Sequence, residues 1–204
     1  MSDRTPEEIL KGPYAPAPRA AERIFDTARE LFYREGIRAV GVDEIVTKAG
    51  VTKPSLYRSY KSKDELVAAV LREVEVGFWA RFEAAEALYP GEPKAQMMAY
   101  FEGLAGRSNG DDYRGCNLSN AVVEYPDRQH AGRIVSQAHK QDLRARLHAK
   151  AAEMGATDPK ALGDAMLLLI EGVFTSSQMF DGDDKPARAV VGAVKALIAA
   201  YCPA

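Results

Sequence analysis

VDEIVTKAGVTKPSLYRSYKSK, residues 42–63, decides how the N-terminal part of the chain folds. Two short helical patterns, residues 42–49 and the segment after Thr52, are separated by Gly50, which permits a tight turn. Thr52 can cap the second helix, and Pro54 suits its first turn because a backbone N–H would have no partner there. This arrangement is typical of a helix-turn-helix. The apolar residues expected to pack the two helices together are Ile45, Val46, Val51 and Leu56.

A longer amphipathic helix is expected before this pair, over residues 19–35. Apolar side chains recur there at three- and four-residue spacing, and Gly36 ends the pattern. Packing the pair on this helix leaves the start of the second short helix exposed. In a helix-turn-helix, that part enters the major groove of DNA. The side chains expected to reach base edges and phosphates are Lys53, Ser55, Tyr57, Arg58 and Ser59.

The charge distribution agrees with one nucleic-acid-binding end. The chain of 204 residues has a net charge of −2. Residues 19–63 carry ten basic and six acidic side chains, whereas residues 64–204 carry 15 basic and 20 acidic ones. A positive N-terminal block on an acidic body indicates that only one end meets a polyanion, although a local excess of this size also arises by chance.

The rest of the chain also reads as helices. Ser62 and Glu65 form a capping-box pattern that opens a long helix ending before Pro90. Further helical patterns cover residues 93–107, 116–125, 127–154, 158–180 and 186–201. Alternating runs of β-branched residues, which are typical of strands, are absent from the sequence. The predicted fold class is all-α, with about nine helices.

Composition excludes several other classes of protein. The longest apolar run, residues 196–202, has seven residues, and a membrane-spanning helix needs about 20. The first residues, MSDRTPEE, lack the apolar core of a signal peptide. Cys116 and Cys202 are too few for a disulfide framework and too far apart for a zinc site. A cytoplasmic protein without a metal or cofactor is therefore expected.

Five short motifs between residues 19 and 66 form a specific pattern. They are Ala28-x-x-Leu31-Phe32-x-x-Glu35-Gly36, VDEI at 42–45, AGVTK at 49–53, Leu56-Tyr57, and SKDEL at 62–66. With these motifs the chain resembles the TetR family of bacterial transcriptional repressors. The resemblance implies a helix-turn-helix DNA-binding domain at residues 19–62. It also implies a helical effector-binding and dimerisation domain at residues 63–204, while the four prolines in residues 1–18 indicate a flexible arm.

The resemblance also implies roles for single residues. Lys53, Pro54 and Ser55 take the family's base-reading positions, and Tyr57 stands where an aromatic residue contacts the DNA backbone or a thymine methyl group. Lys63 stands where a lysine commonly holds a phosphate. The expected DNA-binding residues are Thr52, Lys53, Pro54, Ser55, Tyr57, Arg58, Ser59 and Lys63.

Two C-terminal helices, around residues 158–180 and 186–202, are expected to form a homodimer interface. Residues 165–170, AMLLLI, are apolar all round a helix, so both sides are expected to be buried. Gly172 and Ser176 would let another helix approach closely. A purely intramolecular core is the alternative. The last helix would contribute Val190, Val191, Val194, Leu197, Ile198 and Tyr201.

The helix at residues 116–125 is expected to line a ligand cavity. Cys116, Asn120 and Glu124 are four residues apart and share one face, where Asn120 and Glu124 would orient a polar group. The alternatives are a solvated face and, for Cys116, a small buried residue or a redox-sensitive thiol. Phenylalanine and methionine at helical spacing would form the apolar wall, although they are also typical of a core. These residues are Phe78, Phe82, Met97 and Phe101.

The sequence therefore predicts a homodimeric transcriptional repressor that binds double-stranded operator DNA and is released by a small-molecule effector. A helix-turn-helix activator and a nucleoid-type DNA binder are alternatives. An all-helical enzyme is a further alternative, although the G-x-S-x-G, H-E-x-x-H and Walker motifs are absent from the sequence.

Overall fold

The computed structural model describes residues 19–110, 112–180 and 185–203. Its elements are α2 (Ala20–Glu35), α3 (Val42–Lys48), α4 (Lys53–Ser59), α5 (Lys63–Leu88), α6 (Pro93–Ser108), α7 (Asn117–Glu124), α8 (Ala131–Glu153), α9 (Pro159–Ser176), the 3-10 turn η2 (Pro186–Ala189) and α10 (Val190–Tyr201). No strand occurs within these ranges, so the all-α prediction is confirmed. The predicted arm at residues 1–18 and the predicted break at residues 181–184 lie outside the described residues.

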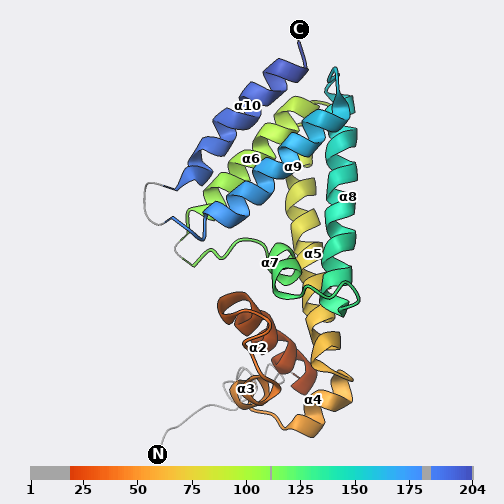
Figure 1. Cartoon of the computed structure of the whole chain (residues 1–204), viewed down its shortest axis with the longest axis vertical. Coiled ribbons are helices and arrows are strands. Elements are labelled where there is room, and N and C mark those ends of the chain that lie inside the picture. Colours follow the sequence, from red (N-terminus) through yellow and green to blue (C-terminus); the bar gives the residue numbers. More distant parts are fainter. Residues whose placement is uncertain (1–18, 111, 181–184, 204) are drawn as a thin grey trace, which may run out of the picture.

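Long helices join the two ends of the molecule (Figure 1). Helices α2, α3 and α4 pack together at one end, and α6, α9 and α10 lie side by side at the other. Helix α5 runs from the first end into the second, with α8 packed along it, and α7 contacts both of these helices. Within the described residues, no helix is both long and apolar enough to cross a membrane.

The helix-turn-helix forms where the sequence predicts it. Gly50 closes the turn with a φ of +62°, a backbone conformation that glycine adopts without strain. Ile45 and Leu56 are completely buried in the core that α3 and α4 share with α2. The predicted side-chain cap of α4 is wrong, because the hydroxyl of Thr52 lies 3.1 Å from the hydroxyl of Ser55 and caps no backbone N–H.

Helix α5 begins at the predicted capping pattern. The Ser62 hydroxyl accepts a hydrogen bond from the backbone N–H of Glu65 at 3.1 Å, and the Glu65 carboxylate accepts one from the backbone N–H of Lys61 at 2.6 Å. An N-cap of this kind contributes about 1 kcal/mol to helix stability. Because α5 continues without a break to Leu88, it ties the helix-turn-helix to the body of the molecule.

Three predicted helix boundaries are wrong, one of them the end of α9, which lies at Ser176 rather than at residue 180. Helix α8 begins at Ala131 rather than at Asp127, because the Asp127 carboxylate closes a local turn and the imidazole of His130 accepts from the N–H of Gly132 as an N-cap. The helix predicted at residues 186–201 is divided into η2 and α10.

The core of the body encloses His139 on α8. Its side chain is completely buried, and its ring packs edge-on against Phe78 with the ring centroids 4.6 Å apart. Neither ring nitrogen has a hydrogen-bond partner within the described residues, although Glu75 lies 3.4 Å from Nδ1. Burial lowers the pKa of His139 from 6.5 to about 4, so the imidazole is neutral and makes no ion pair.

This burial makes folding stability depend on pH. In the unfolded chain His139 takes up a proton as the pH falls through about 6.5, whereas in the folded chain it does so only near 4. Stability contributed by the neutral imidazole is therefore complete above pH 6.5 and is lost progressively below it, by roughly 2 kcal/mol at pH 5. Urea denaturation at pH 5 and pH 8 should show that His139→Leu removes this part of the pH dependence. An equal pH dependence in both proteins would contradict the assignment.

Candidate DNA-binding interface and ligand cavity

Helix α4 presents the predicted DNA-binding side chains on an exposed face. Leu56 faces the core, and the residues around it point away. Tyr57 is 50% exposed, so its ring is accessible on this face. Ser55 is half-buried. The exposed members of the predicted set are Thr52, Lys53, Pro54, Tyr57, Arg58 and Ser59.

Several of these side chains hold internal partners. The ammonium of Lys53 lies 2.7 Å from the carboxylate of Asp43 on α3, which raises the pKa of Lys53. The Ser59 hydroxyl donates to the backbone carbonyl of Ser55 at 3.3 Å. Both contacts are exposed, and an exposed ion pair contributes little to stability. A phosphate can therefore replace Asp43 as the partner of Lys53 at small cost.

The side chain of Lys63 has a hydrogen-bond partner within the chain. Its ammonium donates to the backbone carbonyl of Ile37 at 2.6 Å and lies 5.9 Å from the centroid of the Phe32 ring. Burial lowers the pKa of Lys63. The side chain thus turns inward and holds the start of α5 against the loop after α2. The phosphate contact of Lys63 stays a prediction, and this geometry gives the ammonium a partner within the chain.

Lys61 is the exposed lysine at this point of the chain, and the sequence reasoning missed it. Its ammonium makes no hydrogen bond or ion pair within the described part of the chain. The only signal in the sequence is the run Lys61-Ser62-Lys63, with one lysine on each side of the N-cap. Which of the two turns inward depends on the Ile37 carbonyl, which only the folded chain brings there.

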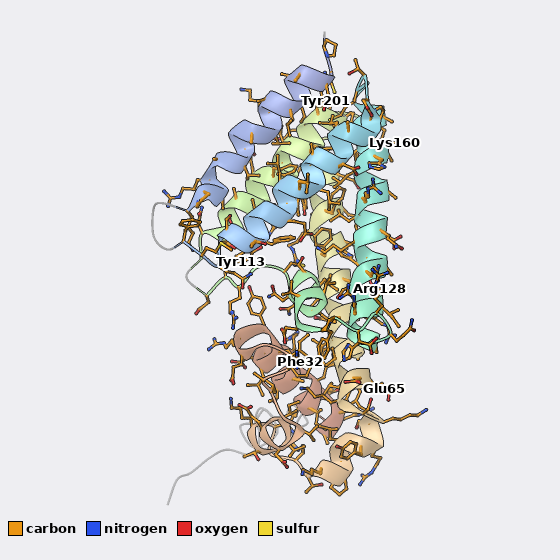
Figure 2. All side chains as sticks on the ribbon, in the orientation of Figure 1. Phe32, Glu65, Tyr113, Arg128, Lys160 and Tyr201 are labelled. Atoms are coloured by element: carbon orange, nitrogen blue, oxygen red, sulfur yellow. The ribbon has the colours of Figure 1, made fainter. Side chains whose placement is uncertain are left out.

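A cavity of about 430 Å³ opens between α5, α6 and the segment before α7. We call it the tyrosine cavity, because Tyr33, Tyr100 and Tyr113 line it. Figure 2 shows Tyr113 between the ends of α6 and α9 and the helix-turn-helix. The apolar walls are Val74, Phe78 and Phe174. Its remaining lining residues are Arg81, Arg107, Gly115, Cys116 and Asn117.

Gly115 allows the cavity wall to approach α9. Its φ is +69°, and a Cβ atom built on it would lie 2.5 Å from the backbone oxygen of Phe174. A side chain at this position would push the segment before α7 away from α9.

A second hollow of about 370 Å³ lies between α2, α7 and α9. We call it the α2–α7 hollow. Asn120 and Glu124 line it, together with Arg114 and Gln178. Tyr33 and Phe174 line both this hollow and the tyrosine cavity, so the two spaces are neighbours.

The predicted ligand-binding residues therefore do not form one site. Phe78 and Cys116 line the tyrosine cavity, whereas Asn120 and Glu124 line the α2–α7 hollow. The other three predicted residues are corrected to core. They line neither space and are almost completely buried: Phe82, Met97 and Phe101.

Core packing explains this difference. The Phe82 ring packs behind the cavity wall, with its centroid 4.8 Å from that of Tyr100. The sequence reasoning also missed Arg81, Arg107 and the three tyrosines of the cavity. Their signal is weak, because polar residues near the exposed edge of an amphipathic helix usually face solvent.

Glu124 connects the body to the helix-turn-helix. One of its carboxylate oxygens accepts a hydrogen bond from the backbone N–H of Arg38 at 2.7 Å. The Arg38 guanidinium donates to the backbone carbonyl of Glu124 at 3.4 Å. A second link joins the hydroxyl of Tyr33, on α2, to the backbone N–H of Arg114 at 2.7 Å. The segment of the chain that borders both hollows thus contacts the helix-turn-helix directly.

Comparison with known proteins agrees with this architecture. Residues 24–70 match the family model of bacterial regulatory proteins of the tetR family. The crystal structure of a TetR-family transcriptional regulator from Streptomyces coelicolor is 30% identical in sequence, with a TM-score of 0.84, and the match covers 90% of this chain and 96% of that one. The chain belongs to the TetR family, whose members are DNA-binding transcriptional regulators rather than enzymes.

Two curated relatives match over part of their length. The transcriptional activator FasR of Mycolicibacterium smegmatis is 40% identical over 62 residues, which are 30% of this chain and 28% of FasR. The transcriptional repressor KstR2 of the same organism is 34% identical over 71 residues, which are 35% of this chain and 34% of KstR2. This chain therefore matches about a third or less of the length of these two relatives.

The inward position of Lys63 leads to a stability prediction. Lys63→Met keeps the aliphatic part of the side chain but leaves the Ile37 carbonyl without its donor. We expect the free energy of unfolding to fall by about 1 kcal/mol. Lys61→Met is the matched control and should leave the stability unchanged, since the Lys61 side chain is exposed. Urea denaturation of both variants measures this, and equal stabilities would show that the Lys63 contact contributes nothing.

Proposed function

We propose that this chain is a ligand-responsive transcriptional repressor that binds a near-palindromic operator as a homodimer and is released by a small-molecule effector. The observation that carries the proposal is the exposed polar face of α4, held on a packed three-helix unit in a TetR-family chain. In this proposal Tyr57 and Ser55 contact the DNA at the centre of that face. Lys53, Arg58 and Lys61 supply positive charge around them.

Operator binding should depend on Tyr57. The DNA to use is the intergenic sequence beside the protein's own gene, and fluorescence anisotropy measures the affinity. We expect Tyr57→Ala to weaken specific binding by about 1–3 kcal/mol. Tyr89→Ala is the matched control, because Tyr89 is also exposed, at 43%, but lies at the other end of α5. Equal losses in the two variants would rule out α4 as the recognition helix.

The same assay tests Lys61. Lys61→Ala should weaken binding to all DNA sequences and lower the salt dependence of log K by about one for each subunit, as expected for a lost phosphate contact. Lys63→Ala should change this slope much less. The opposite result would support the role that the sequence predicts for Lys63.

Activation is the second candidate function, because the chain is 40% identical over 62 residues to the activator FasR. Transcription from the bound promoter separates the two. A repressor lowers the transcript level when it is added, and an activator raises it.

A homodimer through α9 and α10 is supported by an exposed apolar groove between them. Leu168 on α9 is 73% exposed. Beside it, small residues would allow a second copy to approach closely, as in the isologous interfaces of two-fold symmetric dimers. They are Gly172, Ser176, Ala189 and Ala193.

The prediction that six residues of the last helix contribute to the dimer interface is corrected for three of them. Val190, Val194 and Ile198 are buried inside the subunit and belong to its own core. Leu168, rather than Val194, is therefore the position at which to test the dimer.

Leu168→Glu should dissociate the dimer, because it would place an unpaired charge in an apolar interface, at a cost of several kcal/mol. Val76→Glu is the matched control, since Val76 is 68% exposed on α5, away from the groove. Analytical ultracentrifugation at micromolar concentration should show a dimer for the unmodified protein and for Val76→Glu, and a monomer for Leu168→Glu. A monomeric unmodified protein would contradict the proposed assembly.

Effector response is supported by the position of Tyr33. This residue belongs to α2 of the helix-turn-helix, yet its ring lines the tyrosine cavity. A ligand in that cavity would touch the DNA-binding part directly. An effector lowers operator affinity only if it binds better to a conformation in which the two recognition helices no longer fit the half-sites. A ligand that displaces Tyr33 would displace α2 with it. Such a ligand would bind better to the conformation in which α2 has moved than to the one that fits the operator.

A further inference from the structure

Two arginine side chains line the tyrosine cavity. Arg81 on α5 and Arg107 on α6 both line it, and both are exposed at its edge. Neither guanidinium makes a hydrogen bond or an ion pair within the described residues. No described aspartate or glutamate lines the cavity. The two charges thus line one cavity, and no carboxylate among the described residues pairs with either of them.

The two guanidinium groups are positioned in the same way. A Cβ atom on Gly77 would lie 3.4 Å from Nη1 of Arg81, and one on Gly103 would lie 3.2 Å from Nη1 of Arg107. Each arginine therefore folds back along its helix over a glycine one turn earlier, where a larger residue would crowd it. Partial burial and the like charge of Arg81 lower the pKa of Arg107, although the guanidinium stays protonated at neutral pH. An anion between the two groups would relieve this repulsion.

Inside the cavity the surroundings are aromatic. The rings of Phe78 and Phe174 form apolar walls. Tyr100, only 3% exposed, has a hydroxyl without a hydrogen-bond partner among the described residues. Burial raises the pKa of Tyr100, so this hydroxyl is neutral and able to donate. An unpaired buried hydroxyl is costly, and a polar group on a ligand would satisfy it.

We infer that the tyrosine cavity binds an aromatic carboxylic acid. Its carboxylate would lie between Arg81 and Arg107, its ring between Phe78 and Phe174, and a second polar group against the hydroxyl of Tyr100. The volume of about 430 Å³ lies in the range of pockets that hold one small organic ligand. The inference rests on the proposed function only in calling this ligand the effector.

Other ligand classes fit these observations less well. A cationic ligand would add a third positive charge to a cavity lined by two arginines. A neutral apolar ligand would leave both guanidinium groups and the Tyr100 hydroxyl unpaired. A carboxylate forms charge-assisted, often bidentate hydrogen bonds with arginine, which are stronger than bonds between neutral groups.

Isothermal titration calorimetry on the full chain tests the site with three probes: para-hydroxycinnamate, its neutral amide, and cinnamate, which lacks the ring hydroxyl. We expect para-hydroxycinnamate to bind about tenfold or more tightly than the amide. Arg81→Gln and Arg107→Gln should each remove most of this difference in affinity, because they weaken binding of the carboxylate but not of the amide. Tyr100→Phe should weaken para-hydroxycinnamate but leave cinnamate unchanged.

Arg128→Gln is the matched control. Arg128 is also exposed but lies in the turn before α8, across the molecule from Tyr113 (Figure 2). It should bind all three probes as the unmodified protein does. The inference is overturned if the acid and the amide bind with equal affinity, or if neither binds at millimolar concentration. It is also overturned if Arg128→Gln weakens binding of the acid as much as Arg107→Gln does.

Operator release is measured separately, so that failure of this inference and failure of the proposed function remain distinguishable. Arginine-dependent binding of the acid without any change in operator affinity would support the site and contradict its role as the effector site. Operator release by ligands that bind independently of Arg81 and Arg107 would support the proposed function and overturn the assignment of the ligand class.

Discussion

One continuous helix, α5, has to serve two cores at once. Its first turns carry Leu66 and Val67, which are buried at the helix-turn-helix end, and its later turns carry Phe78 and Phe82, which are buried in the body. The capping interaction of Ser62 and the contact of Lys63 with the Ile37 carbonyl fix its start. The helix is continuous from Lys63 to Leu88, so the cavity-lining Phe78 and the start of α5 beside the helix-turn-helix belong to one element.

A second connection runs through the segment before α7. Gly115 lets this segment lie against the backbone of α9, and the Tyr33 hydroxyl accepts from the backbone N–H of Arg114. At the end of α7, Glu124 holds the N–H of Arg38. The body therefore contacts the helix-turn-helix at α5, at Tyr33 and at Arg38. The contacts at Tyr33 and Arg38 are polar and exposed, so they can rearrange without disrupting the apolar packing of α5.

The charged side chains divide into two kinds that matter for function. On the DNA-binding face, Lys53 already has a partner in Asp43, and binding to DNA would exchange one exposed ion pair for another. In the tyrosine cavity, Arg81 and Arg107 have no carboxylate partner among the described residues. An anion in the proposed site would therefore displace no described carboxylate from these two guanidinium groups.

The sequence by itself determined the helices and the face of α4. Apolar periodicity, the Ser62 cap and the turn at Gly50 act within a few residues, so they are readable without the fold. Contacts between distant segments were decided only by the tertiary structure. In the folded chain Lys63 points inward and Lys61 is exposed. Phe82 packs behind the cavity wall, and Arg81 and Arg107, from two helices, line the same cavity. The physical reason is that helical periodicity defines which side of a helix is apolar. The partner that a long side chain meets depends on which other helix is packed there.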